Sequence, residues 1–76
     1  MNKERRNRLK EVKEKIAEIL CTIEEVRDEE EAAYDNLPES IQNGERGELM
    51  YNNVDTLQEI YENLESLPND IDELIG

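Results

Sequence analysis

The sequence predicts an all-α fold, an antiparallel helical hairpin of coiled-coil type followed by a short C-terminal helix. Two observations lead to this prediction. Apolar residues recur at steps of three and four along two long segments, a spacing that places them on one face of a helix. One of the two prolines and two of the three glycines fall between these segments, within residues 34–50, where they favour a turn.

The first long segment predicts a helix over residues 3–35, about 50 Å long at 1.5 Å per residue. Its apolar positions form a heptad-like seam that only Glu30 interrupts, and Ala17 and Leu20 widen the stripe. The predicted seam consists of Leu9, Val12, Ile16, Ile19, Ile23, Val26, Ala33 and Leu37.

A turn is expected over residues 36–45, where residues 38–42 can form one short helical turn with Ile41 pointing inward. The second long helix is expected over residues 46–66, and Pro68 is expected to stop it. A short helix over residues 69–75 follows, capped by Asn69 or Asp70. The second seam consists of Met50, Val54, Leu57, Tyr61 and Leu64.

Two amphipathic helices with a short connection pack antiparallel, because each must bury its apolar stripe against its neighbour. The 76 residues form a single helical domain, 1–76, that is too small to close a large core alone. We therefore expect a homo-oligomer, a dimer in the simplest case.

Composition argues against catalysis. The chain has no His, Trp or Phe, which removes imidazole chemistry and His-ligated metal sites. Around Gly44 the ligand spacing of a calcium-binding loop fails, because Ile41 occupies the third position. We expect no enzyme activity, no cofactor and no metal. The lone Cys21 cannot form an internal disulfide, and no signal peptide or membrane span is recognisable, so a cytoplasmic location is expected.

Charge is distributed unevenly along the chain. Residues 1–15 hold seven basic and three acidic side chains, whereas the whole chain has a net charge of −12. The interpretation we favour is that the acidic C-terminal segment, with Asp70, Asp72 and Glu73, neutralises this basic end. Contact with an acidic face of another protomer is the second interpretation. Direct nucleic-acid binding by Arg5 and Arg6, together with Arg8, is disfavoured, because the remaining negative charge repels phosphates.

The densest feature is residues 24–35, with one carboxylate per roughly 2.6 Å of helix, comparable to the phosphate spacing of about 1.7 Å along duplex DNA. Such a surface can compete for a basic groove made for nucleic acid, which predicts a protein partner with a basic surface. The alternative is that the acids are only solvated and the chain is a structural coiled-coil oligomerisation module. The carboxylates expected to bind the partner are Glu24, Glu25, Asp28, Glu29, Glu31, Asp35, Glu39, Glu45 and Glu48.

An acidic residue on a packing face needs a partner or solvent. Glu30 occupies such a position, and Arg46 lies near the expected bend. We therefore expect a structural clamp in which Arg46 reaches Glu30 or Asp35.

The stretch EEEAAYDNLPESIQNGERGELM resembles small acidic helical proteins, of uncharacterised role, encoded by phages and prophages of low-GC Gram-positive bacteria. The resemblance covers about residues 24–65, and its specific parts are residues 36–40 (NLPES) and 45–48 (ERGE). Gly44 departs from the Ser expected before Glu45. The resemblance implies phage origin, a helical hairpin and the host cytoplasm, but no activity. Some short acidic phage proteins mimic DNA or inhibit a host defence enzyme, so this analogy adds such an inhibitor to the expected functions.

Overall fold

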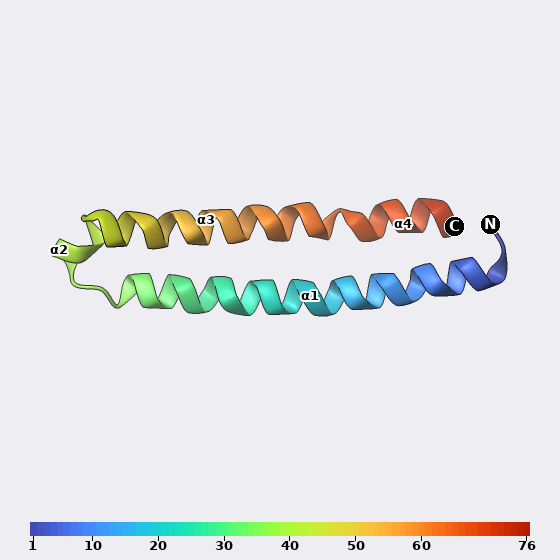
Figure 1. Cartoon of the computed structure of the whole chain (residues 1–76), viewed down its shortest axis with the longest axis horizontal. Helices are drawn as coiled ribbons and strands as arrows, with labels where there is room; N and C mark the ends of the chain where they lie inside the picture. Colours follow the sequence, from blue (N-terminus) through green and yellow to red (C-terminus); the bar gives the residue numbers. More distant parts are fainter.

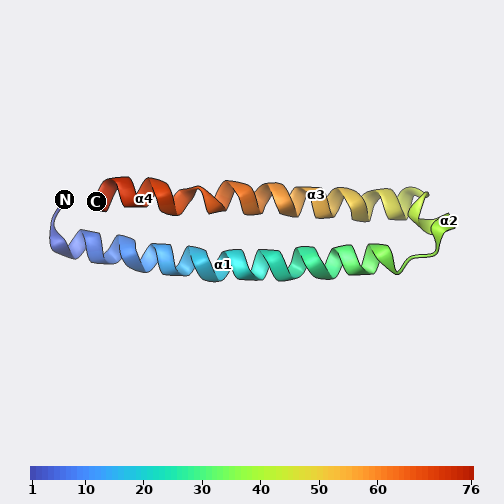
Figure 2. The ribbon, with the colours of Figure 1, turned by 180° about the vertical axis from the view of Figure 1, so that it is seen from behind.

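The computed structural model describes residues 1–76 and contains four helices and no strand: α1 (Lys3–Asp35), α2 (Glu39–Gln42), α3 (Glu45–Glu65) and α4 (Leu67–Ile75). α1 lies antiparallel to α3 and α4, which follow one another along the same side, and α2 lies in the bend (Figure 1). Seen from behind, both termini lie at the end opposite α2 (Figure 2). The Cα trace measures 59 × 15 × 12 Å. The predicted all-α antiparallel hairpin with a short C-terminal helix is confirmed.

The hairpin is held together by one seam of partly buried side chains, which alternate at steps of four and three on both sides, as in a coiled coil. Only Ile16, at 9% exposure, and Gly47 are fully buried, so the hairpin has a seam rather than a closed core. From α1 and the following loop the seam includes Leu9, Lys13, Ile16, Leu20, Ile23, Arg27, Glu30, Tyr34 and Leu37. From the opposite side it includes Met50, Val54, Leu57, Tyr61, Leu64, Pro68, Ile71 and Ile75.

The predicted seam of α1 was wrong at every second position. Val12, Ile19 and Val26 are 41%, 47% and 43% exposed, and the next residue along the chain takes the seam position in each case. Long side chains at these positions can cover the seam with their aliphatic stems while their charged ends reach partners. Lys13 pairs with Asp72 of α4.

Nearer the bend, Arg27 and Tyr34 also occupy seam positions and contact partners across the hairpin. Arg27 donates a hydrogen bond to Gln58 of α3. The ring of Tyr34 packs against that of Tyr51, with centroids 5.9 Å apart and planes tilted by 58°. Each of these contacts is made by a seam residue that was not predicted. Contacts across the hairpin therefore determine which of two nearly equivalent stripes of α1 packs against α3 and α4.

The bend depends on close contacts between α2 and its neighbours. Gln42 of α2 donates a hydrogen bond of 3.0 Å from Nε2 to the carbonyl oxygen of Tyr34 at the end of α1, which also accepts from the backbone N–H of Leu37. Gly47 is buried against the backbone of Gln42. A side chain would not fit there, because a Cβ would lie 2.1 Å from the carbonyl oxygen of Gln42. The expected inward position of Ile41 was wrong, since this side chain is 37% exposed.

The preceding helix ends before Pro68, as expected, but Pro68 itself lies in the first turn of α4. α3 ends at Glu65 and α4 starts at Leu67, so only Ser66 separates the two helices. Proline is tolerated in the first turn of a helix, where its missing N–H would have no partner within the helix. The expected cap at Asn69 or Asp70 was therefore wrong, and Ser66 is the N-cap residue, without a side-chain capping bond.

Candidate partner-binding surface

The seam divides the surface of the hairpin into two flanks. Residues one and four positions after Leu20, Arg27 or Tyr34 turn to one side of the seam, since each residue adds about 100° around the helix axis. The same rule applied to Gly47, Val54 and Tyr61 places their followers on the same side, because corresponding positions of two antiparallel helices share a flank. We call the part of this side formed by residues 24–35 of α1 and 48–65 of α3 the acidic flank. Its exposed carboxylates are Glu24, Asp28, Glu31, Asp35, Glu48, Asp55, Glu62 and Glu65.

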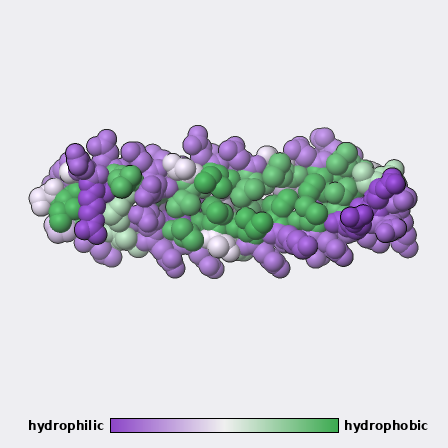
Figure 3. Space-filling model, in the orientation of Figure 1, coloured by the Kyte–Doolittle hydropathy of each residue, from purple (hydrophilic) through white to green (hydrophobic).

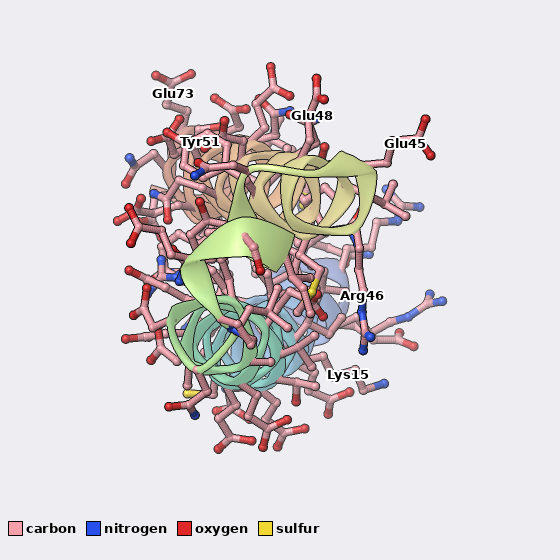
Figure 4. The ribbon with its side chains drawn as sticks, turned by 90° about the vertical axis from the view of Figure 1, so that its left-hand side faces the viewer. Lys15, Glu45, Arg46, Glu48, Tyr51 and Glu73 are labelled. Carbon is pink, nitrogen blue, oxygen red and sulfur yellow. The ribbon has the colours of Figure 1, made fainter.

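A view along the hairpin axis from the bend separates the two sides (Figure 4). Tyr51 lies on the left among carboxylates, whereas Lys15 and Arg46 extend to the right. The right-hand side of this view is the face turned toward the viewer in Figure 1. Glu45 also extends to the right, from the start of α3.

All nine carboxylates predicted to bind a partner are exposed, and all lie in the half of the hairpin that contains the bend. Five of them belong to the acidic flank. Glu25 and Glu45 lie on the outer surfaces of α1 and α3, and Glu39 lies on α2. Glu29 turns to the opposite flank. The structure therefore brings acids of α1 and α3 to one end of the rod, where they surround it rather than form one flat patch.

Sequence reasoning missed three carboxylates of α3 that complete the acidic flank. Asp55, Glu62 and Glu65 are exposed and follow seam residues in the same way as the acids of α1. The prediction covered the densest acidic run and the carboxylates near the bend, and these three residues belong to neither. The heptad phase of the second helix is the signal that would have included them.

Arg27 is the one cation that contacts the acidic flank. Its guanidinium lies 3.1 Å from Oδ1 of Asp28 and 3.9 Å from Oε1 of Glu24, and its side chain is only 20% exposed. It also lies over the ring of Tyr61, 5.7 Å from the ring centroid. Gln58, which accepts from Arg27, donates a 3.1 Å hydrogen bond to Glu62. This network fixes one stretch of the flank, and the other carboxylates of the flank form no ion pair.

The expected clamp between Arg46 and Glu30 or Asp35 was wrong. Arg46 forms no ion pair, and it extends from the start of α3 on the side opposite Tyr51 (Figure 4). It directly precedes Gly47, a seam residue, and this position turns it away from the acidic flank. Glu30 lies half-buried in the seam without an ion pair.

Neutralisation of the basic end by the C-terminal segment is limited to one ion pair. α4 lies beside the N-terminal half of α1, and Asp72 pairs with Lys13. The other basic residues of this end form no ion pair, and most remain exposed. The end of the rod that holds both termini therefore keeps a basic surface.

No group of His, Cys, Asp and Glu side chains is arranged to hold a metal ion. The free thiol of Cys21 is exposed. None of the four helices has an apolar stretch that could cross a bilayer. Comparison with family models, curated proteins and solved structures found no match to this chain. What the fold and the surface define is a class: a helical hairpin with two chemically different flanks.

Proposed function

We propose that this protein is a non-catalytic, phage-encoded binding module whose acidic flank binds a basic surface on a host nucleic-acid-binding or defence protein in the cytoplasm. The observation that supports this proposal is the gathering of eight exposed carboxylates from two helices onto one flank. Between the levels of Glu48 and Glu65 they occur about once per 3 Å of rod. One strand of duplex DNA carries a phosphate charge about every 3.4 Å.

The geometry of the flank favours the interpretation that it mimics nucleic acid, rather than the alternative that its carboxylates are only solvated. The carboxylates stand on two helices joined along a continuous seam, so their spacing is fixed before a partner arrives, which lowers the entropic cost of binding. The net charge of −12 favours rapid encounter with a basic partner. The Arg27 network holds Glu24 and Asp28 in place without covering them, since their side chains are 50% and 60% exposed.

The test is a competition experiment with matched variants. The flank variant carries Glu31→Gln, Asp55→Asn and Glu65→Gln, none of which removes an ion pair. The control variant carries Glu4→Gln, Glu11→Gln and Glu18→Gln, which remove the same charge from the outer surface of α1. Immobilised wild-type protein is expected to retain from host lysate a nucleic-acid-binding protein that added duplex DNA displaces.

The flank variant is expected to lose this capture, and the control variant is expected to keep it. Capture should also fail at roughly 0.5 M salt, where exposed charges are strongly screened. Equal capture by the two variants, or capture that duplex DNA leaves unchanged, would remove the proposal.

A second function, a structural oligomerisation module, is favoured by a different observation. Seven large apolar side chains, on the flank opposite the acids, remain exposed along the rod, and six of them form two heptad-spaced series. In this case the protein would associate only with itself, with little dependence on salt, and the flank variant would behave as wild type.

A further inference from the structure

The flank opposite the acids carries a continuous apolar stripe, which we call the apolar face. Its six side chains form two series with a spacing of seven residues, one on α1 and one along α3 and α4. Their exposures lie between 40% and 60%. A hydrophobic region extends across both helices on the side of the hairpin seen in Figure 3. The apolar face consists of Val12, Ile19 and Val26 of α1, with Ile60, Leu67 and Leu74 of α3 and α4.

The register of the hairpin sets these residues side by side in pairs. Each immediately precedes a seam position, so both series turn to the same flank. The contacts of Lys13 with Asp72 and of Arg27 with Gln58 fix the alignment. Val12 is then level with Leu74, Ile19 with Leu67, and Val26 with Ile60. The three pairs repeat about every 10 Å along the rod.

The surroundings of the apolar face are poor in acid, although the chain as a whole is strongly acidic. Of the charged residues on this flank, only Glu29 and Asp70 are acidic. Lys15 and Arg46 extend on this side (Figure 4). The exposed polar residues that border the face along its length are these two acids together with Arg8, Lys15, Thr22, Thr56 and Asn63.

The hairpin alone leaves much of its apolar surface exposed to solvent. Stable domains enclose a core between packed layers, and two helices form only one layer. With Ile16 as the one buried apolar side chain, the seam is open to solvent along its edges. A β-branched stripe of three residues on α1, unused by the hairpin, is the surface that a second layer would cover.

We propose that a second copy of this chain packs on the apolar face, giving a four-helix bundle in which the bend of each copy lies against the termini of the other. The six side chains of the apolar face span about 20 Å at the middle of the rod. The whole broad side on which they lie, polar borders included, measures 59 × 15 Å between Cα atoms, or roughly 900 Å². A stable interface buries about 800 Å² on each partner, so this area suits a dimer. A two-fold pair is self-complementary, because apolar pairs meet apolar pairs of the other copy.

Charge selects the orientation of the two copies. A shallow groove at the terminal end, between this flank and the outer surface of α1, is lined by Arg5, Arg8 and Lys15 together with Leu9 and Val12. Glu11, on the outer surface, is its one acidic residue. The bend end is surrounded by carboxylates. Copies with both bends at one end would place these acids together, which is repulsive. The opposite orientation brings the basic groove of each copy toward the acidic bend of the other, with Arg8 near the level of Glu29.

The first test is the oligomeric state of the whole chain. Sedimentation equilibrium is expected to give twice the 8.9 kDa chain mass at micromolar concentration. Ile19→Lys with Leu67→Lys should raise the dimer dissociation constant at least about 100-fold, because four lysines would be buried at the centre of the interface. The control, Ala32→Lys with Asn52→Lys, makes the same change of charge on exposed outer positions and should remain dimeric.

Circular dichroism accompanies these measurements. A monomeric face variant supports the proposal whether or not it stays helical, since neither substituted side chain belongs to the seam and the control keeps its helices. A wild-type protein that is monomeric, or a face variant that remains dimeric, overturns the proposal.

The second test determines the orientation. A spin label is attached to Ser40→Cys on α2, in a Cys21→Ser background that removes the native exposed thiol. The proposed arrangement places the two labels near opposite ends of a rod that is 59 Å long. A label separation below half this length would mean that the bends lie together, and it would overturn the orientation.

Discussion

The two flanks of this hairpin come from the same helices and differ by a few positions in heptad phase. Four of the six positions that follow the seam residues Leu20, Arg27 and Tyr34 by one or four carry acids, whereas the positions immediately before them carry Ile19, Val26 and Ala33. One flank is suited to a hydrated, charged partner and the other to exclusion of water. A small helical protein can thus hold two separate binding surfaces, because a single seam orients both.

The largest effect is expected from the seam that both flanks depend on. Ile16→Ala removes the one buried apolar side chain and should lower the free energy of unfolding by about 2–5 kcal/mol. Ile19→Ala, one turn away on the apolar face, should cost less in the isolated hairpin. Chemical denaturation at several protein concentrations separates the two: the deficit of Ile16→Ala persists at every concentration, whereas that of Ile19→Ala grows as the dimer forms. Equal behaviour would mean that seam and face are not distinct.

Substitutions at the bend test the close packing of α2 against α3, which sets the alignment of the helices that carry both flanks. Gly47→Ala places a Cβ in conflict with the carbonyl of Gln42 and should cost about 1–3 kcal/mol. Gly44→Ala is the matched control, because its Cβ would meet atoms no closer than 3.5 Å. Thermal unfolding should show a clear loss for the first variant and little change for the second. A tolerant Gly47 would argue against the close approach of α2 and α3.

Salt should affect partner binding and hairpin stability in opposite directions. Screening weakens the binding of a basic partner to the acidic flank, whereas it relieves repulsion within a chain of net charge −12 and should raise hairpin stability by about 1 kcal/mol. Capture of the partner and thermal unfolding, measured over the same salt series, should therefore move in opposite senses. Parallel loss of both would indicate that ion pairs, rather than the seam, hold the hairpin together.

The smallest effect is expected at the ion pair between α1 and α4. Lys13 and Asp72 have side chains that are 31% and 53% exposed, and such pairs contribute about 0–1 kcal/mol. Lys13→Met keeps the stem that covers the seam and should change stability by less than about 1 kcal/mol. A larger loss, measured by denaturation, would show that the ion pair itself positions α4.

The fold was predictable from sequence because helical periodicity and the breakers near Pro38 report it locally. The phase of the seam was not, because Val12, Ile19 and Val26 form as regular a stripe as the residues that pack. The choice between the two depends on partners far along the chain, such as Asp72 and Gln58, which no local pattern displays.

The candidate site was predictable only in part for the same reason. The acidic run of α1 is visible in the sequence, whereas the contribution of Asp55, Glu62 and Glu65 depends on the phase of α3 against α1. The Arg46 clamp failed because proximity to the bend does not specify the side to which a residue turns. The predicted start of the last helix at residue 69 was wrong because a proline is tolerated within the first turn of a helix, so α4 begins at Leu67.

The most direct test of two unlike flanks is the rate at which single cysteines are alkylated, in the Cys21→Ser background, at Ile19→Cys on the apolar face and Glu31→Cys on the acidic flank. At concentrations that favour the dimer, we expect the thiol at position 19 to react at least about tenfold more slowly than on dilution, because the second copy covers it. The thiol at position 31 should react at one rate throughout. Equal and concentration-independent rates at the two positions would contradict the account.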